Sequence, residues 1–218
     1  MKIIARIQTD FKDKFGIPRQ SGRVPSLSGR IVFEKEYQNP DALRGLDGFS
    51  HLWLIFDFSQ SHRDPWSPTV RPPRLGGNRR IGVFASRSPF RPNPIGLSVV
   101  KLERIEKGEL IVSGVDLLDG TPIYDIKPYL PFADAIPDAV GGYAADFEDY
   151  TLAVEFPEDL LHILPQEKRQ AAIDCLAQDP RPAYQEDDRR YSMAFADWDI
   201  RFFVKENTVY VTEIERRK

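Results

Sequence analysis

The sequence has very few of the residues that build disulfides and thiolate metal sites. It contains one cysteine, Cys175, and three histidines, His51, His62 and His162. A disulfide within the chain is therefore excluded, and a thiolate-rich zinc site is disfavoured. The histidines also lack the spacing of metal ligands, so we expect no bound metal ion.

Long apolar runs are also missing. The longest, Leu52 to Phe56, ends at Asp57 and falls far short of the ~20 residues that a membrane-spanning helix needs. The first residues, Met1 to Arg6, carry charge and no apolar segment of signal-peptide length. We therefore expect no membrane partner and a cytoplasmic location.

Three glycine motifs that are common in enzymes are absent. No G-x-G-x-x-G loop follows a first strand, which disfavours a Rossmann cofactor site. The chain also has no G-x-S-x-G nucleophile elbow and no Walker loop.

What the chain does have is an uneven distribution of charge. Its net charge is only −3, but six arginines and no acidic residue lie between Arg71 and Arg91. Residues 134–188 contain fourteen acidic residues and three basic ones. Because the distribution of charge matters more than its sum, a weakly acidic protein can still present one strongly basic surface.

The first part of the chain is dominated by short, branched and aromatic segments that predict β-strands. A turn at Lys107-Gly108 predicts a hairpin. With few helices between them, the strands favour an antiparallel barrel or sandwich over βαβ repeats. The expected strands cover residues 3–7, 30–34, 51–58, 80–85, 97–102, 110–115 and 123–126.

The last third of the chain has a different pattern. After a stretch rich in Ala, Asp, Pro and Gly at 131–150, helical spacing appears at 158–164 and 166–177, with Pro165 between them. Strands at 195–204 and 208–214 follow, joined by a connection of hairpin length. We therefore expect a mainly β domain over 1–135 and a small α+β domain over 136–218.

Four polar loops carry the chemical information. Pro18-Arg19-Gln20 offers planar donors on a stiff turn. In the segment 69–80, prolines hold the arginines apart, and such a loop suits phosphate contact. Residues 86–96 form a rigid loop with two arginines between two predicted strands. Residues 116–129 combine an Asp119-Gly120 turn with further carboxylates. Solvated surface turns would explain the same residues, most easily in the first loop.

Taken together, these loops resemble the TrmO family, also called TsaA-like or YaeB-like. The similar segments occur in the family's order across nearly the whole chain. They are PRQ at 18–20, FSHLWLIF at 49–56, TVRPPRLGG at 69–77, GVFASRSPFRPNPIGLS at 82–98, DLLDGTPIYDIKPYLPF at 116–132 and LAQDPRPAY at 176–184.

The resemblance implies a single-sheeted antiparallel β-barrel with a small C-terminal appendage, and S-adenosylmethionine as the cofactor. It implies N6-methylation of N6-threonylcarbamoyladenosine at position 37 of tRNA, in the anticodon loop, by a homodimer with sites near the subunit interface. The cofactor contacts that it implies are Pro18, Arg19, Gln20, Ser59, Gln60, Arg87, Leu97, Asp119, Gly120, Thr121 and Pro122. Relatives often have His in place of Ser59.

The chemistry of these residues suits that reaction. An arginine can bind the carboxylate of the cofactor, and Asp119 or Asp125 could accept the proton that N6 must lose. Arginines are also the natural readers of the threonylcarbamoyl carboxylate and of phosphates. The expected RNA contacts are Arg71, Arg74, Arg79, Arg80, Arg91 and Arg181.

Three alternative functions remain open at the level of the sequence. A basic β-barrel could bind RNA without reacting. A methyltransferase of the same fold could act on a small molecule, and a purely structural β-domain is the third alternative. Failure to bind S-adenosylmethionine would favour the first, and activity without tRNA would favour the second.

Overall fold

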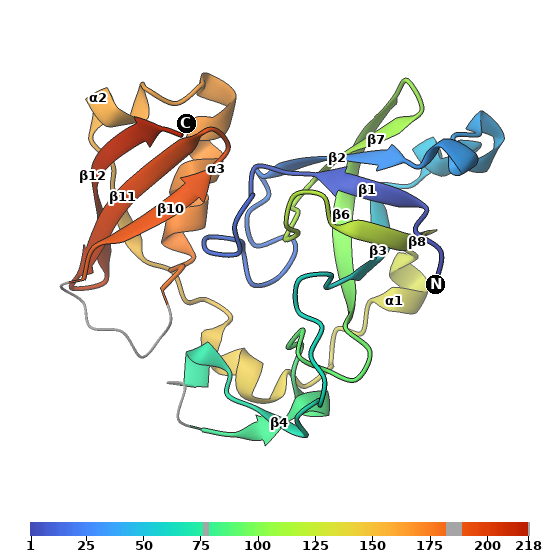
Figure 1. Cartoon of the computed structure of the whole chain (residues 1–218), viewed down its shortest axis with the longest axis horizontal. Coiled ribbons are helices and arrows are strands. Elements are labelled where there is room, and N and C mark those ends of the chain that lie inside the picture. Colours follow the sequence, from blue (N-terminus) through green and yellow to red (C-terminus); the bar gives the residue numbers. More distant parts are fainter. Residues whose placement is uncertain (76–78, 182–188, 218) are drawn as a thin grey trace.

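The computed structural model describes residues 1–75, 79–181 and 189–217, except for the side chain of Arg74. Two bodies are visible in Figure 1: a β-barrel built from the first part of the chain and a separate sheet with its helix built from the last part. Within the described ranges, no helix is long and apolar enough to cross a membrane.

The barrel confirms the predicted antiparallel architecture. It closes in the order β1-β2-β7-β6-β3-β8. β3 shows why the sheet curls around a core: Leu52, Leu54 and Phe56 are buried, while the residues between them are only half-buried. The barrel strands are β1 (Ala5–Gln8), β2 (Ser28–Phe33), β3 (His51–Asp57), β6 (Ile95–Glu106), β7 (Glu109–Ser113) and β8 (Pro122–Pro128).

The predicted hairpin between β6 and β7 is confirmed. Its turn residues, Lys107 and Gly108, have φ angles of 52° and 81°, and such angles are most easily adopted by glycine. Short 3-10 helices follow β2, at η1 (Lys35–Tyr37), η2 (Pro40–Leu43) and η3 (Leu46–Gly48).

The expected strand at 80–85 is only partly correct. Only Ile81 and Gly82 are extended, as β5 (Ile81–Gly82), and they pair with β4 (Thr69–Val70) in a ribbon outside the barrel. The chain then turns through η5 (Val83–Ala85), and η4 (Pro73–Leu75) lies between the two strands of the ribbon. The branched residues that predicted a barrel strand instead anchor a long excursion between β3 and β6.

The C-terminal body confirms the predicted α+β pattern. α2 (Glu158–Leu161) and α3 (Gln166–Ala177) flank Pro165, and β11 (Trp198–Lys205) and β12 (Thr208–Arg216) form the expected hairpin. The sheet has the order β10-β11-β12-β9, with β10 at Tyr191–Phe195 and β9 at Ala153–Glu155. Between the two bodies lie α1 (Pro131–Asp134) and η6 (Gly142–Phe147).

The two bodies meet through the loop at residues 9–27, between β1 and β2. Phe11 packs edge-on against Phe195 with ring centroids 5.6 Å apart. Lys168 on α3 donates to both carboxylate oxygens of Asp10, at 2.8 and 2.6 Å. The buried side chains of both bodies therefore form one continuous core.

Candidate cofactor and RNA site

Every segment that the sequence analysis assigned to the cofactor leaves the same end of the barrel. β1, β3 and β7 end there, while β2, β6 and β8 begin there, because neighbouring strands run antiparallel. The loop 9–27, Ser59 and Gln60, residues 87–97 and the turn 116–122 are the connections at this end. The fold thus gathers segments that lie far apart in the sequence.

The loop 9–27 contacts each of the other segments. Lys14 Nζ donates to the carbonyl of Gln60 at 2.7 Å. The amide of Thr9 donates to Asp119 Oδ1 at 2.9 Å, and the amide of Asp119 donates to the carbonyl of Phe11 at 2.7 Å. This loop is therefore the structural link between the predicted cofactor segments.

Arg87 and Gln20 lie together at the centre of this arrangement. Arg87 Nη1 donates to Gln20 Oε1 at 2.5 Å, across 67 residues of sequence. Arg19 is exposed and directs Nη2 to the carbonyl of Arg181 at 3.0 Å. Pro18 is buried and fixes the base of the loop. A guanidinium group held in place by an amide suits a carboxylate ligand.

The residues Ser21, Ser98 and Asp116 form a polar cluster that the sequence analysis did not assign to the site. Ser98 Oγ donates to Asp116 Oδ1 at 2.7 Å, and the amide of Val99 donates to Ser21 Oγ at 3.2 Å. Burial raises the pKa of Asp116 to about 6, against the opposing effects of Ser98, the backbone of Ser21 and the charge of Arg87. The sequence analysis had noted Asp116 only as one of the carboxylates in the segment 116–129.

The turn Asp119–Pro122 is held by its own backbone and by β1. The amide of Gly120 donates to the carbonyl of Ile7 at 2.8 Å, and Thr121 Oγ1 donates to the carbonyl of Leu118 at 2.6 Å. Gly120 has a φ of +75°, and a Cβ atom added there would meet nothing within 4 Å. A rigid backbone edge beside open space suits a planar base.

Leu97 and Ser59 border the same end of the barrel. Leu97 projects outward from β6 and keeps 55% of its surface exposed. Ser59 and Gln60 are both exposed just after β3. The site thus combines one apolar side chain with cationic, anionic and backbone polar groups, as S-adenosylmethionine would require. The chain's own residues therefore fit this cofactor.

The expected catalytic carboxylates differ in their surroundings. Asp119 caps the turn described above, whereas Asp125 lies on β8 with Oδ2 3.1 Å from Lys127 Nζ. A third carboxylate, Asp57, was not expected: His62 Nε2 lies 2.7 Å from Asp57 Oδ1. Burial and the neighbouring Asp57 carboxylate together raise the pKa of Tyr124.

The expected RNA-binding arginines lie mainly on the excursion between β3 and β6. Arg71, Arg79 and Arg80 are exposed, and Arg91 is half-buried with Nη1 3.1 Å from the carbonyl of Ser86. The side chain of Arg74 lies outside the described residues, as do Gly76, Gly77 and Asn78. The excursion begins and ends at the same end of the barrel as the cofactor segments.

Arg181 has a different environment. It is buried, and Nε donates to Asp179 Oδ1 at 2.9 Å. Tyr150 donates its hydroxyl to the other oxygen of Asp179 at 2.8 Å. The structure therefore gives the Arg181 guanidinium an internal partner, while its carbonyl accepts from Arg19.

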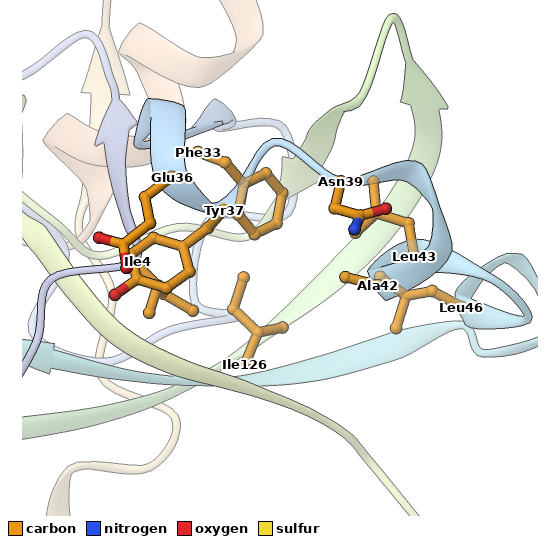
Figure 2. A pocket seen from close by; sticks show the side chains of 9 residues that line it. All are labelled: Ile4, Phe33, Glu36, Tyr37, Asn39, Ala42, Leu43, Leu46 and Ile126. Atoms are coloured by element: carbon orange, nitrogen blue, oxygen red, sulfur yellow. The ribbon is translucent and has the colours of Figure 1, made fainter.

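A separate cavity of about 390 Å³ opens at the opposite end of the barrel. Figure 2 shows its lining, in which Tyr37 lies beside Ile4 on one side of Ile126, and Asn39 and Leu43 lie on the other side. None of the expected cofactor or RNA residues borders it. Elsewhere in the described ranges, no group of three His, Cys, Asp or Glu side chains could hold a metal ion.

Comparison with known proteins gives the arrangement a family. The model of the tRNA-methyltransferase O N-terminal domain matches residues 6–135, and the model of the TrmO C-terminal domain matches residues 149–217.

Two curated relatives cover most of the chain. A tRNA (adenine(37)-N6)-methyltransferase of Escherichia coli is 44% identical over 98% of this chain and 97% of its own length. A putative S-adenosylmethionine-dependent methyltransferase, RcsF, of Pseudomonas aeruginosa is 48% identical over 90% of this chain and 89% of its own.

The fold agrees with a solved structure. A crystal structure of TrmO from Pseudomonas aeruginosa superposes with a TM-score of 0.81 at 38% identity, and covers 98% of this chain and 96% of that one. Both domain models match in order, and the similarity extends over almost the whole chain. The chain therefore belongs to the TrmO family.

Proposed function

We propose that this S-adenosylmethionine-dependent tRNA (adenine(37)-N6)-methyltransferase acts on an adenine 37 that already carries an N6-threonylcarbamoyl group. The observation that carries the proposal is the single barrel end at which all predicted cofactor segments and the arginine-rich excursion meet. The relatives named as adenine-37 methyltransferases support the reaction class.

The chain's own residues would hold the cofactor by complementary groups. Bound S-adenosylmethionine supplies an electrophilic methyl group. Arg87, oriented by Gln20, is suited to its carboxylate, and Asp119 to its ammonium or ribose hydroxyls. The backbone at Gly120 and Thr121 would border the adenine, with Leu97 as the apolar surface. Pro18, Arg19, Ser59, Gln60 and Pro122 complete the proposed contacts.

The substrate nitrogen must lose its proton during methylation. We propose Asp119 or Asp125 as the acceptor, because a carboxylate within reach of the reacting nitrogen can act as a general base. Lys127 Nζ pairs with Asp125 Oδ2 at 3.1 Å. If Asp119→Asn and Asp125→Asn both retain full turnover, neither residue is the acceptor.

The threonylcarbamoyl group adds a carboxylate to the substrate, and the tRNA adds phosphates. The proposed contacts to these anions are Arg71, Arg74, Arg79, Arg80 and Arg91. Arg181 is a weaker candidate because it is buried. Within the described ranges, Arg71, Arg79, Arg80 and Arg91 form no ion pair with a carboxylate. Their charge is thus available to an anionic partner.

A homodimer is the proposed working assembly. On the outer face of the barrel, Leu97 pairs in register with Ile55, and Ile95, 38% exposed, pairs with Asp57. This apolar strip continues to Trp53 opposite Val99. Because Leu97 is also a proposed cofactor contact, a second copy on the strip would cover the site. Sedimentation of Ile55→Glu against the wild type tests this: an unchanged dimer, or a wild-type monomer, contradicts it.

The two domains would divide the work. We propose that residues 1–135 bind the cofactor and RNA, and that residues 136–218 support the loop 9–27, through contacts such as Lys168 with Asp10. The proposed compartment is the cytoplasm, where tRNA is modified.

The decisive experiment is methyl transfer from labelled S-adenosylmethionine to two tRNA pools, with and without the threonylcarbamoyl group. We expect label only in the modified pool, and less of it with Arg87→Ala when the cofactor is below saturation. Label in both pools would contradict the requirement for the modification. Cofactor binding without label in either pool would point to a small substrate, and failure to bind the cofactor would favour a plain RNA-binding barrel.

A further inference from the structure

Two large aromatic side chains lie exposed at the proposed RNA-binding end of the barrel. Phe84 keeps 74% of its surface exposed and Trp66 keeps 46%. Their ring centroids are 6.3 Å apart with planes inclined by 33°. Exposing this much aromatic surface is unfavourable in water, so a pair of this kind marks a surface with a partner.

Phe84 lies in a turn that its neighbours hold in place. The adjacent Val83 is fully buried, and its amide donates to the carbonyl of Pro68 at 2.9 Å. Ser86 then closes the turn of η5 by donating from both its amide and Oγ to the carbonyl of Val83, at 3.2 and 2.9 Å. With Val83 pointing inward, the next side chain in the turn points outward.

The other aromatic rings suited to base stacking already have partners. The Arg63 guanidinium lies 3.7 Å from the centroid of the Phe90 ring and covers one of its faces. Tyr124 contacts the carboxylate of Asp57. Tyr129 packs against Trp53, with centroids 5.8 Å apart. Trp66 and Phe84 were not singled out in the sequence, yet they present the more accessible faces.

The chain that follows Trp66 is basic. No Asp or Glu occurs between Pro65 and Arg91. Arg80 Nη1 bonds to Thr69 Oγ1 at 3.2 Å, which brings a cation to the ribbon beside the turn that carries Trp66. Exposed aromatic faces among arginines are the combination with which proteins bind unpaired nucleobases and their phosphates. These like charges would oppose the same face of a second protein copy.

We propose that Trp66 and Phe84 form a stacking platform for an unpaired base of the anticodon loop next to adenine 37. The proposal rests on the proposed tRNA site and adds a specific contact to it. The base would stack on Phe84 while the arginines bind the adjoining phosphates. Stacking would hold the loop open, so that adenine 37 can leave its neighbours and enter the cofactor site.

The test compares Phe84→Ala and Phe84→Tyr with a matched control, Phe132→Ala. Phe132 is 87% exposed and lies on α1, outside the basic excursion. tRNA binding is measured by titration, cofactor binding by calorimetry and oligomeric state by sedimentation. We expect about 5- to 150-fold weaker tRNA binding for Phe84→Ala, near-normal binding for Phe84→Tyr and for the control, and unchanged cofactor binding.

Titrations with modified tRNAs identify the base that stacks on Phe84. tRNAs that lack the base on either side of position 37 are titrated against the wild type and Phe84→Ala. We expect one abasic site to weaken wild-type binding and to remove most of the effect of Phe84→Ala, since both changes delete one contact. Fully additive losses, or tRNA binding unaffected by Phe84→Ala, would overturn the proposal.

Two further outcomes distinguish the platform from a subunit interface and from a failure of the proposed function. Dissociation of the oligomer by Phe84→Ala with normal tRNA binding would assign the pair to a subunit interface and overturn the proposal. Wild-type protein that neither binds nor methylates tRNA would instead disprove the proposed function itself. If the wild type methylates tRNA and only Phe84→Ala loses tRNA binding, the result supports both the stacking platform and the proposed function.

Discussion

Ser98 on β6 donates a hydrogen bond of 2.7 Å to the carboxylate of Asp116, just beyond the end of β7. The same carboxylate is bonded by the backbone of Ser21, directly after the Pro18-Arg19-Gln20 loop, and feels the charge of Arg87. One partly buried carboxylate therefore joins three of the segments proposed to bind the cofactor.

Asp116 should make the stability of the protein depend on pH. Burial raises the pKa of this carboxyl from 3.8 to about 6. The native state then binds more protons than the unfolded state between these values, so the free energy of unfolding falls as pH rises through this window. The effect is at most about 3 kcal/mol, reduced by solvent screening.

Asp116→Asn removes this titration. In urea unfolding between pH 4 and pH 7, the free energy of unfolding of the variant should rise relative to that of the wild type as pH rises. Ser98→Ala is the companion, since losing the donor to the ionised carboxylate should raise the pKa of Asp116 further and steepen the dependence. A difference between Asp116→Asn and wild type that stays constant with pH would contradict the assignment.

Arg87→Ala should weaken the binding of S-adenosylmethionine by about 10- to 100-fold, because a charged hydrogen bond to the cofactor carboxylate is lost. Arg87→Lys should recover only part, since an ammonium cannot form the bidentate pair. Calorimetry measures both. The control is Arg44→Ala, which changes an exposed arginine paired with Asp41 at the opposite end of the barrel. Equal effects of Arg87→Ala and Arg44→Ala would exclude a direct contact.

The fold was largely predictable because its strands and turns are encoded locally. The Lys107-Gly108 turn, the alternation in β3 and the break at Pro165 each specify one element. The segment 80–85 was mispredicted as a whole strand because Ile81, Val83 and Phe84 are branched or aromatic. Local propensity cannot reveal that Val83 is buried in a turn while Phe84 is exposed.

The site was predictable as a set of loops but not as a geometry. Composition identified the segments around Arg19, Arg87 and Asp119, and family resemblance gave them a cofactor. Contacts across many residues of sequence, such as Arg87 with Gln20, cannot be read from either. For the same reason Ser98 and Asp116 were not assigned to the site, and the sequence predicted Arg181 as an RNA contact without revealing its buried partner, Asp179.

Arg80→Ala should raise the KM for tRNA and also reduce the dependence of that KM on salt. Arg80 is exposed and bonds to a neutral hydroxyl, that of Thr69, so its charge remains available to a phosphate. We expect the KM for tRNA to rise several-fold, and the slope of log KM against log salt to fall by about 0.7–0.9 if one phosphate contact is lost.

The control for that measurement is Arg104→Ala. Arg104 is also exposed but bonds to Glu106 on the β6–β7 hairpin, at the other end of the barrel. It should leave both KM and the salt slope unchanged. A wild-type KM that does not respond to salt would remove the basis for phosphate contacts on the excursion.

Arg181→Ala should destabilise the fold more than it impairs RNA binding. Arg181 and Asp179 are both buried, and Nε lies 2.9 Å from Oδ1. Removing the cation leaves a buried carboxylate that keeps the Tyr150 hydroxyl as a donor, at a cost of about 3–5 kcal/mol. The double variant Arg181→Met, Asp179→Asn should recover part of that loss in urea unfolding, because neither buried charge then remains. If Arg181→Ala instead keeps its stability but loses tRNA affinity, the arginine acts on RNA, and the C-terminal domain must move to expose it.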